Sequence, residues 1–317
     1  TQFSYSYFTL DFKKKRGGLF EEVFVNKVNG MSNNSVARKL KINEGSVRLR
    51  LGELKRQALL RKKELEQGVT IKEPVVYDGF ETFFYSQFDP CYVNTAIGKE
   101  SLYAYELNFS PLNRKGRMTA WQKKKNEEIK KKLGAYPQNS IRVQSTYTFK
   151  KLLSFAKERA LVLHTDEHKS YSASIQKDLA SEKITQHVTN SKVKRDNRNP
   201  LFPVNHLHLH YRHFTSPHRR ETIAFNKNEA GLMNVLLLKT VNKNFLMPQI
   251  LNRAPSNKER NQRSPAMEVG LTEKIMEFAE FFDYRRSAHQ FALDEVEKEM
   301  FYDTWKYARR KVRAYAG

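Results

Sequence analysis

The chain has 317 residues, room for two or three domains, and 39% of them are hydrophobic, so a sizeable core is expected. Lys and Arg number 57 against 34 Asp and Glu, a formal net charge of +23 that favours a polyanionic partner, nucleic acid ahead of an anionic membrane. The single Cys91 excludes a disulfide framework and a cysteine-based zinc site within this chain, and no apolar run approaches the ~20 residues of a membrane span, so we expect a cytoplasmic protein with no membrane partner.

The amino-terminal part of the chain is basic and predicts short helices. Residues 1–18 have the composition of a basic and aromatic arm. The apolar spacing of residues 19–30 suits a helix with glycine at its end. A second, short helix is predicted over residues 34–40, with Ser32 as its N-cap.

A turn at residues 41–45 and a long basic helix over 47–66, opened by Ser46, complete this region. Helix, tight turn and basic helix are typical of a helix-turn-helix, so we expect an all-α DNA-binding domain over residues 19–67. The alternative is a three-helix bundle with a solvated basic face. The expected DNA-contacting residues of this domain are Asn43, Ser46, Arg48, Arg50, Lys55 and Arg56.

The composition changes after a linker at residues 68–74. Residues 75–85 read as a strand that contains Asp78, and residues 101–109 alternate well enough to be its neighbour, with turns between them at Asp89-Pro90 and at Gly98. A basic insert follows at about residues 111–135 and includes a polar helix over 120–133 that is either solvated or lies along a polyanion. The insert's expected DNA contacts are Arg114, Lys115 and Arg117.

The next elements place a second acid at a strand end. A helix over residues 147–158 precedes the apolar run 160–163, which predicts a buried strand, and Asp166 follows it. A strand end is rigid and still reaches solvent, which suits a catalytic carboxylate. The elements predicted beyond it are a helix at 172–179, a strand at 183–188, a basic loop at 190–200, an ambiguous segment at 204–214, an apolar helix at 229–245, and a helical carboxyl-terminal region over 266–317 with helices at 272–282 and 294–316.

This order of elements resembles the ribonuclease H-like α/β fold, a mixed sheet flanked by helices, which we expect over residues 75–246. In that fold the first and fourth strands lie side by side, so Asp78 and Asp166 would meet. Two close carboxylates repel, and a divalent cation relieves that repulsion. Two Mg²⁺ ions held in this way can activate a water or a 3′-hydroxyl for phosphodiester cleavage. Either Asp taken alone is more simply a strand-end or turn residue.

Three segments together resemble transposases of small bacterial insertion sequences, of the DDE type. Residues 77–81, Tyr-Asp-Gly-Phe-Glu, resemble the strand of the first Asp. Residues 165–171, Thr-Asp-Glu-His-Lys-Ser-Tyr, resemble the second-Asp segment, in which a Tyr follows about five positions later. Residues 219–227, Arg-Arg-Glu-Thr-Ile-Ala-Phe-Asn-Lys, resemble the segment after the third catalytic position. The resemblance covers most of residues 20–245.

The family's spacing places the third metal ligand at Asn205, where an acid is usual. Arg212 follows seven residues later, two helical turns on, and fits the basic residue of the family pattern. An amide oxygen ligates Mg²⁺ more weakly than a carboxylate, and related branches carry Asn or His in this place. Glu221 and His206 are the alternative ligands, and an inactive copy is the remaining possibility.

Residues 206–210, His-Leu-His-Leu-His, allow other interpretations. On a strand the three His share one face and could bind zinc, and on a helix His206 and His210 share a face. The simplest alternative is that Leu207 and Leu209 pack while the His side chains lie near DNA phosphates.

The resemblance implies a DNA transposase that binds double-stranded DNA, the terminal inverted repeats and the target. It also implies Mg²⁺ or Mn²⁺ as cofactor, at least a homodimer on DNA, and a nucleoid-associated location in a bacterium. Arg219 and Arg220 join the expected DNA contacts. Family members often carry an upstream zinc-binding module, and because this chain lacks its cysteines we expect a late start or a branch without the module. A decayed transposase acting as a DNA-binding regulator and a ribonuclease H-like nuclease are the alternative functions.

Overall fold

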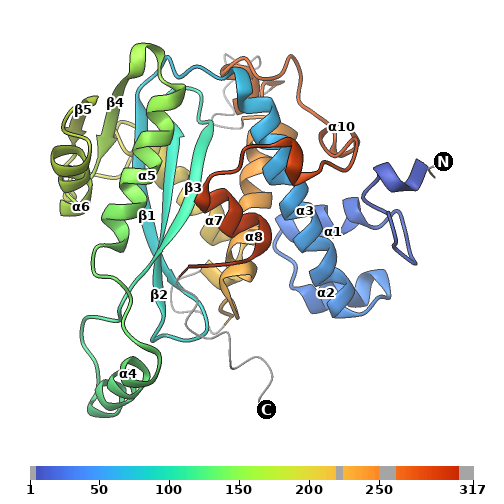
Figure 1. The fold of residues 1–317 in the computed structure, drawn as a ribbon, viewed down its shortest axis with the longest axis horizontal. Helices are drawn as coiled ribbons and strands as arrows, with labels where there is room; N and C mark the ends of the chain where they lie inside the picture. Colours follow the sequence, from blue (N-terminus) through green and yellow to red (C-terminus); the bar gives the residue numbers. More distant parts are fainter. Residues whose placement is uncertain (1–4, 219–223, 250–261, 307–317) are drawn as a thin grey trace.

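A five-stranded mixed sheet lies at the centre of the molecule in the computed structural model, which describes residues 5–218, 224–249 and 262–306 (Figure 1). The strand order is β3-β2-β1-β4-β5. The β1–β2 and β2–β3 pairs are antiparallel, whereas β1–β4 and β4–β5 are parallel, so β1 joins the two kinds of pairing. The strands are β1 Val75–Phe83, β2 Pro90–Gly98, β3 Ala104–Pro111, β4 Ala160–Thr165 and β5 Lys183–Val188.

Helices cover both faces of the sheet at β2 and β3, whereas β4 alternates between buried and exposed residues, so the strand expected to be buried at 160–163 is buried on one face only. Successive side chains of a strand point to opposite faces, and in β1 Tyr77 packs with helix α5 (Ser140–Phe155), while Val76 joins the core formed with α7 (Phe202–Phe214) and α8 (Glu229–Val241). The mixed α/β architecture with a sheet flanked by helices is therefore as expected. The α5 helix begins before the predicted residue 147, and the ambiguous segment at 204–214 is the helix α7.

Strand β2 is the main element that the sequence prediction missed. The turns expected at Asp89-Pro90 and Gly98 are its two ends. Eight of its nine residues are buried, because helices cover both faces of the sheet here, so the polar–apolar alternation of a half-exposed strand is absent. Two corrections follow: β3 is the neighbour of β2 rather than of β1, and β4 becomes the fourth strand of the sheet.

Three helices precede the sheet: α1 (Phe20–Val28), α2 (Asn33–Leu40) and α3 (Glu44–Leu65). Ser32 is the N-cap of α2, as predicted, and its hydroxyl accepts the Ser35 N–H at 3.1 Å. Helix α3 starts earlier than predicted, because Asn43 rather than Ser46 caps it and accepts the Gly45 N–H at 2.7 Å.

The long helix α3 is mostly internal and packs along α8 (Figure 1). One hydrophobic cluster contains Val36 of α2, Leu54 of α3 and Tyr77 of β1. The amino-terminal helices therefore share their core with the α/β region. Even Lys55 is fully buried, and its Nζ lies 2.5 Å from Asp303.

The remaining helices are shorter or stand off the sheet. Helix α4 (Ala120–Leu133) matches the polar helix predicted in the basic insert and extends away from the body (Figure 1). The helix predicted over residues 272–282 is wrong, because only α10 (Phe278–Phe281) forms there. Of the last predicted helix, α11 (Glu295–Tyr302) is present, and its end at 307–316 lies outside the described residues. The other short helices are α6 (Lys169–Ala173) and α9 (Pro265–Glu268).

Within the described ranges, no helix combines the length and the apolar character that crossing a bilayer requires.

Candidate two-carboxylate site

Two neighbouring parallel strands bring Asp78 and Asp166 to the same edge of the sheet. Tyr77 of β1 is paired with Thr165 of β4, and each Asp is the next residue of its chain segment. Both Asp side chains line one open groove. The sequence prediction that these two distant residues come together therefore agrees with the geometry of the sheet.

The Asp78 carboxylate is electrostatically uncompensated. Burial, and to a lesser extent the charge of the nearby Asp166, raise the pKa of Asp78 to about 6. Hydrogen bonds from the Gly79 backbone and from two tyrosine hydroxyls oppose that shift only in part. Among the described residues, Asp78 has no Lys or Arg ion-pair partner. A cation bound here would relieve this unfavourable charge.

Tyr92 of β2 and Tyr171 of α6 hold one oxygen of Asp78. The Tyr92 hydroxyl donates to Asp78 Oδ1 at 3.1 Å, the Tyr171 hydroxyl reaches the same atom at 3.4 Å, and the two hydroxyl oxygens are 3.0 Å apart. Gly79 is required beside this contact, because a Cβ there would overlap the Tyr92 ring. The tyrosine pair thus fixes one oxygen of a carboxylate that lines the groove.

This tyrosine pair was not assigned from the sequence. Tyr171, which the sequence placed in the second-Asp segment, is fully buried with its ring 4.9 Å from that of Tyr77, and its hydroxyl belongs to the site. Tyr92 lies on the strand that the prediction missed. The glycine directly after Asp78 was the available signal, since it indicates that another chain segment approaches closely there.

The Asp166 carboxylate is positioned by the start of its loop. The His168 N–H donates to Asp166 Oδ1 at 2.9 Å. The adjacent Glu167 turns outward instead and accepts hydrogen bonds from Asn190 Nδ2 and the Ser191 N–H, both at 3.0 Å. Glu167 therefore fixes the following basic loop and is not a further acid of the groove.

Helix α7 places Asn205 and Arg212 in the same groove as the two acids. They are two helical turns apart and share a face. The Asn205 side chain has no hydrogen-bond partner among the described residues. The Arg212 guanidinium lies 5.3 Å from the ring centroid of Phe80. Between them, His208 is buried, and burial together with the Arg212 charge lowers its pKa to about 3, so it is neutral.

The alternative interpretations of residues 206–210 are resolved by the helix. The three-histidine strand is wrong, because these residues belong to α7. His206 and His210 share a face, with ring centroids 4.6 Å apart, but that face stacks on Phe202 and does not line the groove. Leu207 is buried as expected, whereas Leu209 is 62% exposed and lines the groove. His206 is therefore poorly placed to be the third ligand.

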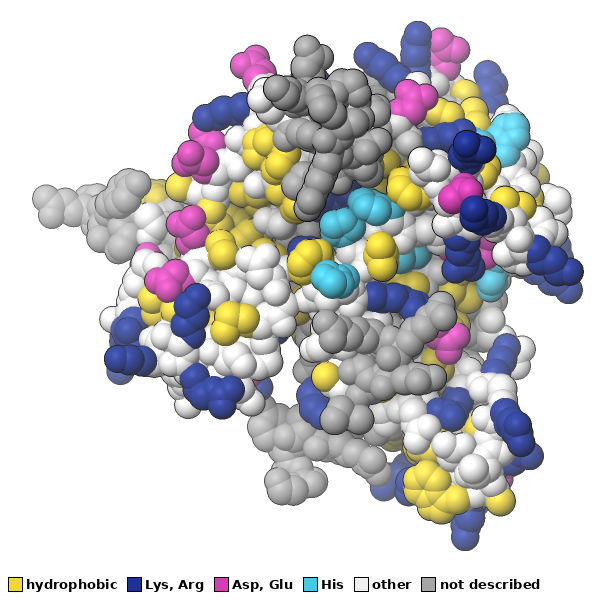
Figure 2. Space-filling view, turned by 180° about the vertical axis from the view of Figure 1, so that it is seen from behind, with side chains coloured by type: hydrophobic (Ala, Val, Ile, Leu, Met, Phe, Trp, Pro, Cys, Tyr) yellow, Lys and Arg dark blue, Asp and Glu magenta, His cyan; other side chains and the backbone are white. Residues whose placement is uncertain are grey.

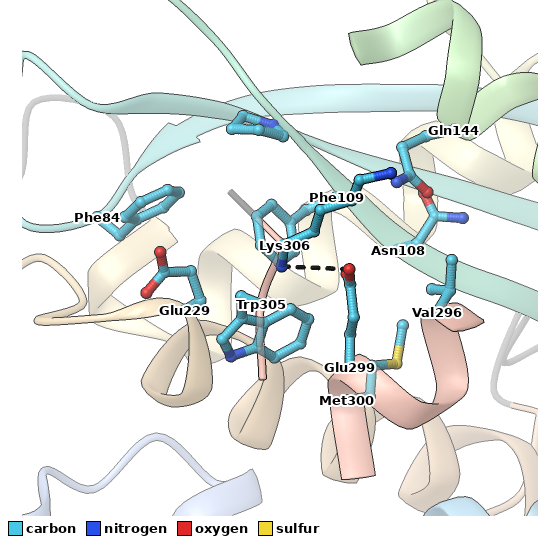
Figure 3. A pocket seen from close by; sticks show the side chains of 11 residues that line it. Phe84, Asn108, Phe109, Gln144, Glu229, Val296, Glu299, Met300, Trp305 and Lys306 are labelled. Atoms are coloured by element: carbon cyan, nitrogen blue, oxygen red, sulfur yellow. Dashed lines mark hydrogen bonds between the residues drawn. The ribbon is translucent and has the colours of Figure 1, made fainter. Parts of the chain in front are cut away.

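Glu81 of β1 is a further acid that lines the groove, whereas the later Glu229 does not. Glu221, like Arg219 and Arg220, lies outside the described residues. Glu229 lies in a separate small pocket with Phe84 and Trp305 (Figure 3), where it accepts a hydrogen bond from the Tyr85 hydroxyl at 3.0 Å.

The expected DNA-contacting residues divide into exposed and internal ones. At the amino end of α3, Asn43 and Arg48 are exposed and Ser46 is half-buried. Arg50 is buried against the Phe20 ring and Lys55 is enclosed, so neither lies on a surface that DNA could reach. Arg56 pairs with Glu53 at 2.6 Å, Arg114 lines the groove, and Lys115 and Arg117 are exposed. Arg195, which also lines the groove, was not singled out from the sequence.

The groove offers oxygen donors to a hard cation. Two carboxylates, Asp78 and Asp166, and the amide oxygen of Asn205 are the ligand types that Mg²⁺ and Mn²⁺ prefer. In the described part of the chain, no three His, Cys, Asp or Glu side chains lie together as a metal site. This agrees with a site whose third candidate ligand is the Asn205 amide.

No protein-family model matches the chain, and no curated protein matches it.

Proposed function

We propose that this chain is a DNA transposase, with a ribonuclease H-like catalytic region and a helix-turn-helix formed by α2 and α3. One observation carries the proposal: β1 and β4 bring Asp78 and Asp166 to one groove, beside Asn205 and Arg212 of α7. The strand order β3-β2-β1-β4-β5, with β1 antiparallel to β2 and parallel to β4, supports the ribonuclease H-like assignment.

The reaction would be phosphodiester cleavage followed by strand transfer. A water oxygen forms a bond to the phosphorus while the bond to the 3′-oxygen breaks, and that oxygen leaves as a hydroxyl. The freed 3′-hydroxyl then attacks a target phosphate in the same way. Asp78, Asp166 and Asn205 would hold two Mg²⁺ or Mn²⁺ ions, which when bound lower the pKa of the attacking hydroxyl and stabilise the leaving oxygen.

Each protein group has its own part in this proposal. Asp78, fixed by the tyrosine pair, supplies a carboxylate to the groove. Arg212 and Arg195 supply positive charge for the phosphates of the bound strand. His208 is neutral and hydrogen-bonded to Thr95 at 3.3 Å, so it fixes the α7 face rather than moving a proton.

DNA recognition is assigned to the exposed amino end of α3. Asn43, Ser46 and Arg48 lie there, where a recognition helix presents its side chains to base edges. We further propose that the partners are double-stranded terminal inverted repeats and target DNA. On DNA the protein would be a dimer, and its location would be nucleoid-associated.

The direct test uses labelled duplexes carrying the two DNA ends that flank the gene, a plasmid target, and Mg²⁺ or Mn²⁺. The proposal predicts nicking at the ends and covalent joining to the plasmid, both abolished by Asp166→Ala. Cleavage without joining would favour the nuclease, and binding without either would favour the regulator. Full activity of Asp166→Ala would show that the site assignment is wrong.

A further inference from the structure

Trp121 is a large apolar side chain left in solvent. It is 64% exposed, at the second position of α4 after the Thr119 cap. Exposure of an indole ring forgoes the gain from burying one of the largest apolar surfaces a residue can offer. The only other Trp of the chain, Trp305, is 7% exposed.

Trp121 is connected to the rim of the two-carboxylate groove. Its ring centroid lies 6.2 Å from that of Phe88, and the Arg114 guanidinium covers Phe88 at 5.4 Å. Arg114 Nη1 donates to the Gln87 side chain at 2.8 Å, and Gln122 of α4 donates to the same oxygen at 3.2 Å. Gln87 and Arg114 both line the groove, so the start of α4 is held at its edge.

The surroundings of this ring are strongly cationic. Helix α4 carries six Lys and two Glu, and only Asn126 and Ile129 are buried in it. The lobe that contains α4 shows Lys and Arg side chains around a small hydrophobic patch (Figure 2). A protein partner would require a broad apolar face, whereas a single aromatic ring in a field of lysines matches a polyanion that also has flat π-surfaces.

We propose that Trp121 is a stacking platform for an unpaired nucleobase of DNA, with the α4 lysines holding the phosphates of that strand. The inference rests on the proposed function only in taking DNA as the polymer in the groove. Every base has a π-face, so the platform would accept any base at the position that reaches it. The groove then binds two features of one strand, a phosphate at the carboxylates and a base at its rim.

Tryptophan fluorescence provides the test, because the difference between the wild-type protein and Trp121→Leu isolates the exposed ring. The probes are one duplex with a short thymidine overhang, the same duplex with an abasic overhang of equal length, and the blunt duplex. We expect the thymidine overhang to quench the Trp121 signal and the abasic overhang, with the same charge, to leave it unchanged.

Affinity for the same probes gives a second readout. Trp121→Leu should weaken binding of the thymidine overhang by between about 5-fold and about 100-fold, the range for one base–aromatic stack. It should leave the abasic and blunt duplexes nearly unchanged, and Trp121→Phe, which keeps a ring, should restore most of the loss. Circular dichroism of the variants checks that this exposed substitution leaves the fold intact.

An absence of quenching, or an equal affinity loss for all three probes, would overturn the inference. Stronger binding of an acidic protein than of any DNA probe would overturn it too and indicate a protein-docking surface. Strand transfer measured on the same preparations separates the two proposals. Transfer without quenching removes the stacking platform alone, and quenching without cleavage or transfer keeps it while removing the transposase.

Discussion

Two acidic sites of this molecule are built in opposite ways. Glu297 of α11 accepts from Lys63 at 2.7 Å and Lys151 at 2.9 Å, and although burial acts to raise its pKa, these cations lower it to about 2. Asp78 faces another acid, Asp166, and its pKa is raised to about 6. The charge of Glu297 is neutralised by two lysines, so this carboxylate stabilises the fold. Asp78 has no such partner among the described residues, so its carboxylate is suited to bind a cation from solution.

The largest effect expected is loss of stability in Glu297→Gln. The variant leaves Lys63 and Lys151 without this charge in a poorly solvated place, which should cost about 2–3 kcal/mol of unfolding free energy at pH 7. Because the folded pKa is depressed to about 2, the contribution is full above pH 4.5 and is lost as the pH falls toward 2. Urea unfolding between pH 7 and pH 2.5 measures this.

The matched control is Glu295→Gln on the same helix. The Glu295 side chain is 90% exposed and its one ion pair among the described residues is with Lys298, so its loss should change stability by less than about 0.5 kcal/mol. Equal effects of the two substitutions would break the distinction between a satisfied interior acid and a surface one.

The opposite sign is expected for Asp78→Asn. Without metal, the folded state disfavours the Asp78 charge, a penalty that is full above about pH 6 and absent below the ordinary value of 3.8. The isosteric amide removes the charge but also weakens the hydrogen bonds that the carboxylate accepts, so the variant should be more stable than the wild-type protein by about 1–2 kcal/mol at pH 8 in EDTA, less than the full value of the shift. The difference should vanish near pH 4, and Mg²⁺ should stabilise only the wild-type protein. A less stable variant at pH 8 would contradict this account of the site.

The smallest effect expected is that of Tyr92→Phe, which removes one hydroxyl from Asp78 Oδ1 and keeps the ring. The carboxylate then has more rotational freedom, so Mn²⁺ affinity should fall by about 3-fold to 10-fold, as for the loss of one hydrogen bond that orients a ligand. Water-proton relaxation in Mn²⁺ titrations measures this without any DNA. Tyr85→Phe, on a tyrosine that bonds Glu229 outside the groove, should leave the affinity unchanged.

The sequence predicted the part of the site that depends on local pattern. The apolar run before Asp166 and the strand around Asp78 were recognisable, and the seven-residue spacing of Asn205 and Arg212 placed them on one helix face once α7 proved helical. The sequence did not predict the role of Tyr92, because Tyr92 lies on β2. A strand covered on both faces lacks the alternation of polar and apolar residues by which strands are recognised.

Basic helices were the least predictable feature. Helices α3 and α4 are both basic in sequence, yet Lys55 and Lys62 of α3 are internal, paired with Asp303 and Glu66, while the lysines of α4 face outward. The difference depends on acids far along the chain, such as Asp303, which a local pattern does not contain. A run of positive charge therefore does not by itself identify a DNA-binding face.

The most direct test of the central claim, that Asp166 holds a catalytic metal ion, is DNA cleavage by Asp166→Cys in Mg²⁺ and in Mn²⁺. A thiolate is a poor ligand for Mg²⁺ and a better one for Mn²⁺. The account predicts that this variant is inactive with Mg²⁺ and regains cleavage with Mn²⁺, while the wild-type protein uses either. Equal cleavage by Asp166→Cys in the two metals would contradict it.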